Sequence, residues 1–237
     1  MINKFKIAKF MATVFTPEFH IGNTLSLANI IQNISGDKFN GEFISVPIPQ
    51  EAPPEIPRII MNSQDGTWKL EVSLLRTNLL FLKPINLSVD IPEIEEFGKF
   101  ACNFFGSYKR SGNTKIQKIG LVSERFLEFV NDPPSQFIAE KFCNEHYSKK
   151  IFDNTISFEI HSLKKYNFED FNINSWIRFR SAKLATQTKT PVLLVENDIN
   201  TYGEEDKEID FDVDNIMRFF TVIPVHINNI LKLFLEM

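Results

Sequence analysis

Hydrophobic and polar residues alternate along several stretches of the chain, and this period of two predicts β-strands. The first such stretch covers residues 4–16. Apolar residues at helical spacing then predict a helix over residues 23–34, and a proline-rich loop follows at residues 47–57. Three short apolar stretches separated by turn residues come next. We interpret them as an antiparallel meander over residues 59–61, 69–75 and 79–82.

A long helix is predicted to begin at Asp90. Asp90 is a suitable cap, Pro92 suits the first turn, and Glu93 has the spacing of a capping box. The apolar residues that follow recur at helical spacing, so we expect them to form a buried face: Ile94, Phe97, Phe100, Ala101, Phe104 and Phe105.

The second part of the chain repeats this order of elements. Residues 115–130 have the pattern of a strand, or of a pair of strands, and residues 132–142 predict a short helix. Three further strands are expected at residues 151–163, 173–184 and 192–199. A last long helix spans about residues 212–235, and Pro224 inside it predicts a kink.

These patterns predict an α+β fold made of two similar halves. In each half, a strand, a helix, three strands and a long helix follow one another. We expect the strands of each half to form an antiparallel sheet with the helices packed on one side. We place the N-terminal half at residues 1–112 and the C-terminal half at residues 113–237, packed as one compact unit.

Composition refines this interpretation. Hydrophobic residues make up 43% of the 237 residues, and the 24 phenylalanines predict a core built on aromatic packing. The net charge of −4 argues against a protein that coats nucleic acid over its whole surface. Two cysteines, Cys102 and Cys143, are too few for a disulfide framework. With no secretion signal and no run of about 18 apolar residues, we expect a cytoplasmic protein without membrane contact.

Two stretches resemble a known family. Residues 57–83 contain a strand, a polar turn and an apolar strand, and residues 192–202 (VLLVENDINTY) precede an acidic gap and a long helix that contains His226. Together they resemble a sporadically distributed, functionally uncharacterised bacterial protein family of about this length. The resemblance covers most of the chain and implies no catalytic residues.

Two short patterns resemble metal sites. Cys143 and His146 form a C-x-x-H pair, but no second pair of comparable spacing exists, so we expect no bound metal. Asp210-Phe211-Asp212-Val213-Asp214 resembles the start of a calcium loop. Asn215 stands where that loop needs Gly, and Thr221 stands where it needs Glu. We therefore interpret these acids as the start of the last helix, where they complement its dipole.

The sequence contains little evidence for catalysis. Glu159 and His161 lie two residues apart, so on a strand they share a face and could act as an acid/base pair, or form part of a solvated surface. The sequence contains no nucleophile elbow, phosphate-binding glycine loop or dinucleotide fingerprint. We expect no catalytic residues and no cofactor.

Charge is unevenly distributed along the chain. Residues 99–189 contain 15 basic and 9 acidic residues, whereas residues 190–237 contain 3 and 10. Within the basic part, Trp176, Arg178 and Arg180 alternate with apolar residues, so a strand there would present an aromatic ring and two guanidinium groups on one face.

Two interpretations of this face remain open. It could contact phosphates and stack on bases, or the acidic segment at residues 203–214 could neutralise it. If the face binds nucleic acid, we expect these residues to take part: Lys109, Arg110, Lys115, Lys118, Lys164, Lys165, Trp176, Arg178, Arg180 and Lys183.

The last helix carries more large apolar residues than one buried face needs. Phe219 and Phe220 are adjacent and point about 100° apart on a helix, so one could face the sheet and the other a second subunit. We therefore predict a homodimer interface formed by Phe219, Ile223, Ile227 and Phe234.

These observations favour a non-enzymatic binding or accessory protein that acts through protein–protein contacts as a homodimer. It could belong to a larger protein or nucleoprotein complex. The alternative is a nucleic-acid-binding accessory factor of a bacterial defence complex, for example of CRISPR type. An enzyme of unknown activity is the second alternative.

Overall fold

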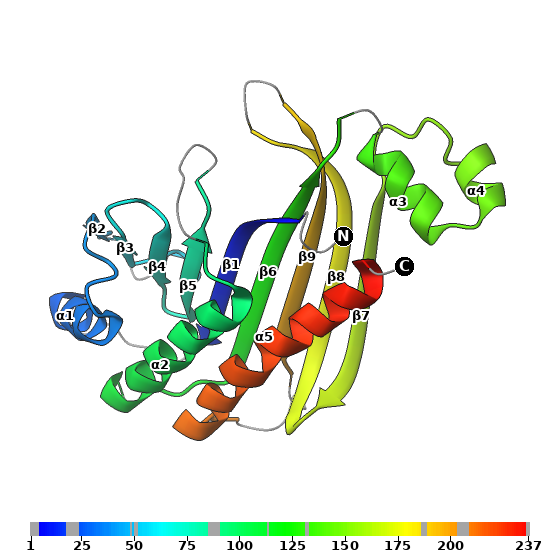
Figure 1. Cartoon of the computed structure of the whole chain (residues 1–237). Coiled ribbons are helices and arrows are strands. Elements are labelled where there is room, and N and C mark those ends of the chain that lie inside the picture. Colours follow the sequence, from blue (N-terminus) through cyan, green and yellow to red (C-terminus); the bar gives the residue numbers. More distant parts are fainter. Residues whose placement is uncertain are drawn as a thin grey trace.

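Nine strands form one antiparallel sheet in the computed structural model (Figure 1). The structure describes residues 5–17, 24–47, 49, 52–84, 91–112, 114–130, 133–185, 189–202 and 209–235, without the side chains of residues 112, 234 and 235. The predicted cap at Asp90 lies outside these residues. The sheet together with its helices confirms the predicted α+β class.

The strand order across the sheet is β2-β3-β4-β5-β1-β6-β9-β8-β7. In chain order the strands are β1 (Lys6–Phe15), β2 (Phe43–Ser45), β3 (Ile59–Asn62), β4 (Trp68–Val72), β5 (Arg76–Leu82), β6 (Lys118–Glu128), β7 (Glu159–Phe168), β8 (Phe171–Lys183) and β9 (Pro191–Thr201). The helices are α1 (Thr24–Ser35), α2 (Ile94–Gly112), α3 (Pro134–Phe142), α4 (Glu145–Lys150) and α5 (Val213–Leu235).

The two halves have matching topology, as the sequence predicts. From the centre outward, the first half runs β1-β5-β4-β3 and the second runs β6-β9-β8-β7, and each half ends in a long helix. Strands β1 and β6 pair with each other, so the halves share one sheet across the predicted boundary. The halves differ at their outer edges, because only the first half has an additional strand, β2, beside β3.

The predicted strand over residues 151–163 is wrong in its position. Helix α4 occupies the preceding residues, because Asn144 caps it by accepting a hydrogen bond from the Tyr147 backbone N–H at 3.2 Å. The chain then turns through Asn154, whose φ is +56°, before β7 begins at Glu159. Strand β2 is a second element that the sequence pattern did not predict.

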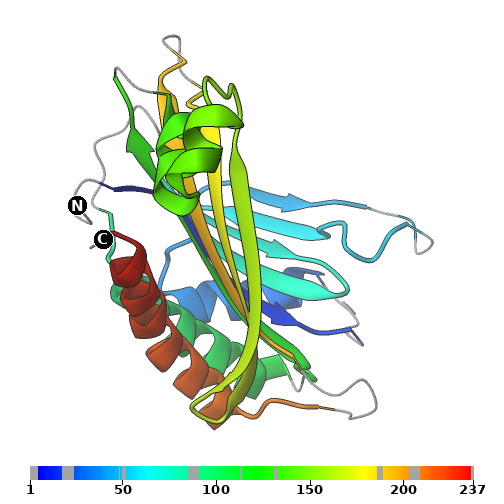
Figure 2. The same cartoon turned by 90° about the vertical axis from the view of Figure 1, so that its right-hand side faces the viewer.

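The long helices lie on one face of the sheet, and no helix of the described residues lies on the opposite face (Figure 2). Buried aromatic side chains fill the space between α2, α5 and the sheet, which agrees with the predicted aromatic core. The rings of Phe105 on α2 and Phe220 on α5 stack at 5.4 Å, and Phe10 on β1 meets Phe97 on α2 at the same distance. No helix in the described part of the chain is long and apolar enough to cross a membrane.

Helices α2 and α5 come closest at Gly98. A Cβ atom at this position would lie 2.4 Å from the Pro224 ring and 2.7 Å from the backbone oxygen of Phe220. Proline has no N–H to donate to the carbonyl four residues earlier, so the Phe220 oxygen lacks its usual helical partner. The glycine therefore lets the two helices, and with them the two halves, pack against each other at this point.

Candidate functional site

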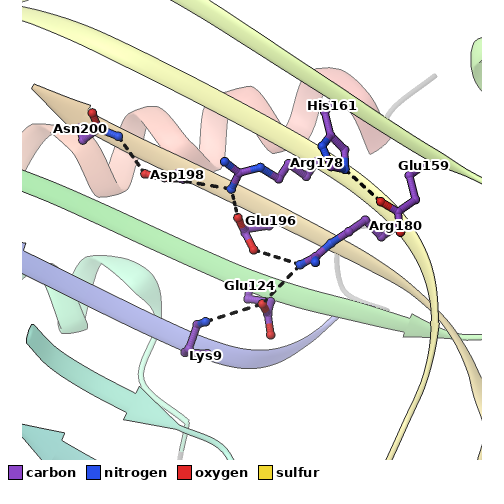
Figure 3. A network of polar contacts seen from close by, with 9 residues as sticks. All are labelled: Lys9, Glu124, Glu159, His161, Arg178, Arg180, Glu196, Asp198 and Asn200. Carbon is purple, nitrogen blue, oxygen red and sulfur yellow. Dashed lines mark hydrogen bonds and ion pairs between the residues drawn. The ribbon is translucent and has the colours of Figure 1, made fainter. Parts of the chain in front are cut away.

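Polar side chains gather on the open face of the sheet, opposite the helices. They come from five neighbouring strands, β1, β6, β9, β8 and β7, and Figure 3 shows them. We call this set the charged network: Lys9, Glu124, Glu159, His161, Arg178, Arg180, Glu196, Asp198 and Asn200.

Strand register places five of these residues in one row across the sheet. Lys9 pairs with Glu124, and Glu124 pairs with Glu196. Glu196 pairs with Arg178, and Arg178 pairs with His161. Directly opposed side chains in an antiparallel sheet are about 5 Å apart at Cβ, so each member is in reach of the next. The row thus places two carboxylates side by side in the middle, with cations to either side.

Arginines bind the two central carboxylates together. Arg180 Nη2 lies 3.0 Å from Glu196 Oε2 and 3.9 Å from Glu124 Oε2. Arg178 hydrogen-bonds Glu196 on its other side and lies 3.8 Å from Asp198. Glu196 is the centre of the network, and its side chain is only 14% exposed.

The network leaves little net charge for an external ligand. Its three cations, Lys9, Arg178 and Arg180, face four carboxylates. The Trp176 ring is also occupied, because the Arg178 guanidinium lies over it at 4.8 Å. Nucleic-acid binding needs uncompensated positive charge, since phosphate contacts supply most of the affinity. The arrangement is better suited to holding five strands in register.

Carboxylates do neutralise Arg178 and Arg180. They do not come from the described part of the acidic segment at residues 203–214, which was one of the two interpretations. In the described part of the acidic segment, Asp210 instead accepts hydrogen bonds from Lys109 Nζ at 2.7 Å and the Ile116 backbone N–H at 2.9 Å. Asp212 caps α5 by accepting from the Asn215 N–H. The carboxylates that meet the arginines come from β9, which pairs with β8, and from β6, which lies on the other side of β9.

The other predicted nucleic-acid residues do not join this face as one patch. Arg110 contacts the sulfur of Met217 on the helix side of the sheet, and Lys118 lies over the Phe15 ring. Lys164 and Lys165 are consecutive on β7, so their side chains leave on opposite faces. Lys115 lies in the loop before β6, and Lys183 lies at the end of β8.

The predicted dimer interface on α5 is wrong for the residues whose side chains are described. Phe219, Ile223 and Ile227 are 0% exposed within a single chain. Phe219 packs edge-on against Phe171 of β8, and Phe220 packs against α2, so both phenylalanines have a place in the core. The reason is that α5 lies between the sheet and α2 and buries two adjacent faces. The Phe234 side chain lies outside the described residues.

Neither metal-like pattern gathers its ligands. Cys143 ends α3 and His146 lies on α4, where its ring meets Tyr147 edge-on. Within the described residues, no group of three or more His, Cys, Asp and Glu side chains is placed to hold a metal ion. Glu159 and His161 do share the open face and lie 3.1 Å apart, and both are exposed.

A second histidine contact lies on the helix side, between α5 and β7. The Tyr166 hydroxyl is 2.6 Å from His226 Nε2, and the Phe168 ring stacks on the imidazole at 3.9 Å. Burial lowers the pKa of His226, and the positive charge of Lys164 lowers it further. A hydrogen bond between the Tyr166 hydroxyl and His226 Nε2 thus connects α5 to the outer strand.

A polar cavity of about 410 Å³ opens beside α1 and the β3–β4 turn. The Lys38 ammonium lies 4.2 Å from the Trp68 ring centroid and 5.0 Å from that of Phe100. Burial lowers the pKa of Lys38, and nearby Asp65 opposes this shift. Asp65 itself accepts hydrogen bonds from Ser63 and Thr67, which shape the turn. The lysine thus attaches the loop after α1 to the aromatic core.

Sequence reasoning missed an apolar surface at the end of the sheet where β6 ends and β7 begins. Four large apolar residues of the connection between β6 and β7 are exposed, Val130, Tyr147, Ile151 and Ile156, and we call them the end surface. Val130 is 93% exposed and Ile156 is 98% exposed. Ile156 also lines a cavity of about 320 Å³ together with Pro133, Pro134 and Pro191. Helices α3 and α4 project beside it (Figure 1).

A cluster of exposed apolar residues in one short segment could have been suspected from the sequence. The pattern over residues 151–163 instead predicts a strand, so it does not distinguish Ile151 and Ile156 from the residues of β7 that follow. No family model and no curated protein sequence matches this chain. The resemblance to the bacterial family therefore stays a prediction, and the functional argument rests on the geometry of the chain itself.

Proposed function

We propose that this chain is a non-enzymatic binding protein that acts through protein–protein contacts and works as a homodimer. The observation that carries the proposed contact with a partner protein is the end surface, with its two almost completely exposed aliphatic side chains, Val130 and Ile156. Single exposed apolar residues are normal on protein surfaces, so we base the proposal on four such residues in one connection between strands and on the cavity that Ile156 lines.

Burying these side chains against a partner would contribute favourably to binding. Covering a fully exposed Val or Ile side chain contributes about 1.5–3 kcal/mol. The neighbouring cavity, lined by Pro133, Pro134 and Ile156, offers a recess for an apolar side chain of a partner. Anchors of this type, which fill pockets, provide most of the energy of protein interfaces. We expect the partner to present an apolar segment there.

The alternatives have less support. Binding of nucleic acid by the predicted strand face would require Arg178 and Arg180 to give up Glu196, which is largely buried between them. Glu159 and His161 are both exposed on the open face, and they line neither of the two cavities described above. We therefore propose neither activity for the isolated chain.

The test uses the protein as bait in lysate of its own organism. We expect a partner that the wild type retains and that the double variant Val130→Glu/Ile156→Glu loses. Two exposed aliphatic contacts together correspond to about 3 kcal/mol, or over a hundredfold in Kd. Binding is then measured between the purified bait and the purified partner.

Leu25→Glu is the matched control. Leu25 is 66% exposed on α1, at the far side of the molecule, so the substitution places a glutamate at an exposed apolar position away from the end surface. The control should retain the partner with wild-type affinity. If every retained protein also binds the double variant equally well, the end surface is not an interaction site.

A further inference from the structure

Strand β7 is the last strand of the sheet and leaves a long backbone edge unpaired among the described residues. It has ten residues, Glu159–Phe168, whereas the strand at the opposite edge, β2, has three. Figure 2 looks onto this side of the molecule, and β7 runs uncovered below α3 and α4. Unpaired N–H and C=O groups on an exposed edge are ready to pair with another strand.

The geometry of the β7–β8 hairpin decides which residues present these groups. The hairpin closes at Phe168 and Phe171 around a two-residue turn, in which Glu169 has a φ of +51°. At the far end, the Phe158 carbonyl accepts a hydrogen bond from the Ser181 N–H at 3.3 Å. Backbone groups on a strand alternate in direction, so even-numbered residues face β8. The odd-numbered residues, 159 to 167, therefore direct their N–H and C=O groups outward.

The other half of the molecule shows how such an edge is completed. Strand β3 occupies the position in the first half that β7 occupies in the second. Strand β3 is covered by β2, which pairs antiparallel with it from Phe43 to Ser45. Strand β7 lacks this additional strand. The fold thus places an antiparallel strand beside one of its two equivalent positions and none, in the described residues, beside the other.

We propose that a second copy of this chain supplies the missing strand, with β7 pairing antiparallel to β7 of the partner copy. The inference rests on the proposed homodimer and identifies its interface. A symmetric pair that uses every outward-facing residue is centred on Leu163. Leu163 then lies opposite Leu163 of the partner subunit, His161 opposite Lys165, and Glu159 opposite Asn167. The joined sheet has twice the nine strands of one chain.

Side chains on both faces suit this register. On the open face, Leu163 is 41% exposed and would be covered by its own copy. Glu159 would become a diagonal neighbour of Lys165 from the partner copy, which brings opposite charges together at both ends of the pair. On the helix side, half-buried Ile160 would lie opposite Tyr166. A register centred on Lys165 would instead oppose two lysines.

Cysteine cross-linking tests the register directly. Residues opposed in a hydrogen-bonded antiparallel pair have Cα atoms about 5.5 Å apart, within the range for a disulfide. In a Cys143→Ser background, Leu163→Cys should therefore form a disulfide-linked dimer under mild oxidation. Asn167→Cys is the matched control, because it lies on the same edge and face while the symmetry keeps its two copies about 25 Å apart. Equal cross-linking of both variants, or of neither, overturns the proposal.

A proline at position 163 provides the second readout. Leu163→Pro removes an outward N–H and leaves the ladder to β8 intact, so the chain should fold but have half the mass of the wild type in light scattering. Ile156→Glu, on the end surface, should remain a dimer. A Leu163→Pro protein that stays dimeric refutes the β7 interface and leaves the homodimer standing. A wild type that is monomeric at tens of micromolar refutes both.

Discussion

Replacing Gly98 by alanine tests the packing of the two halves, because two physical effects oppose each other there. Alanine in a helix interior is more favourable than glycine by about 1 kcal/mol, so propensity alone predicts a more stable protein. The added Cβ would, however, lie 2.4 Å from the Pro224 ring and 2.7 Å from the Phe220 oxygen. Neither atom can move without shifting α5.

The magnitude follows from these contacts. Overpacking of a well-filled core costs about 1–3 kcal/mol, and two contacts with rigid atoms justify the upper end. After the gain in propensity, we expect Gly98→Ala to lose about 2 kcal/mol, which lowers Tm by about 4–8 °C for a chain of this size. Chemical denaturation followed by circular dichroism measures the loss.

Gly106→Ala is the control on the same helix. Its Cβ would meet the flexible Met217 side chain at 3.3 Å, so the methionine can move aside and the propensity gain should remain. The two variants should therefore differ in sign. A Gly98→Ala protein as stable as Gly106→Ala would refute the close approach of α2 and α5.

Three further results are expected. Phe219→Glu should unfold or severely destabilise the chain, since it places a charge in the core. If the variant instead stays folded and becomes monomeric, the dimer interface predicted on α5 would be correct after all. Glu196→Gln should cost about 1–2 kcal/mol in urea denaturation, because two arginines lose their shared partner, and no loss would mean that the network contributes nothing. His226→Gln should flatten the stability profile below pH 6.5. The lowered pKa of folded His226 lets the unfolded chain bind the proton first, so stability falls as pH drops from 6.5 to the folded value; an unchanged profile would refute this.

Sequence periodicity was sufficient to predict the repeat and most of its elements, but it did not predict β2 or α4. Strands with one buried face tend to alternate apolar and polar residues, as much of residues 4–16 does, and the long helices carry apolar residues at helical spacing. The boundaries of β7 could not be predicted, because Ile151 and Ile156 have the β propensity of a strand but lie in an exposed turn region. The β propensity of a residue indicates that it suits a half-buried strand. It does not indicate whether another layer of the protein covers that residue.

The candidate site was predictable only in part. Alternation placed Trp176, Arg178 and Arg180 on one face, and the structure has them there. Their partners were missed, because Glu124 and Glu196 are distant in sequence and meet β8 only through the strand order β6-β9-β8. Phe219 shows the same limit: a helix buried on two adjacent faces has the sequence pattern of one that is shared between the core and an interface.

The mass of the wild-type protein in solution tests the central claim most directly. One chain has a mass of 27.5 kDa, so light scattering across a dilution series should give twice this value at tens of micromolar and fall toward it on dilution. The same series on the Leu163→Pro variant should give the single-chain mass throughout. A wild type that remains at 27.5 kDa at every concentration would contradict both the homodimer and the pairing of β7 with its copy.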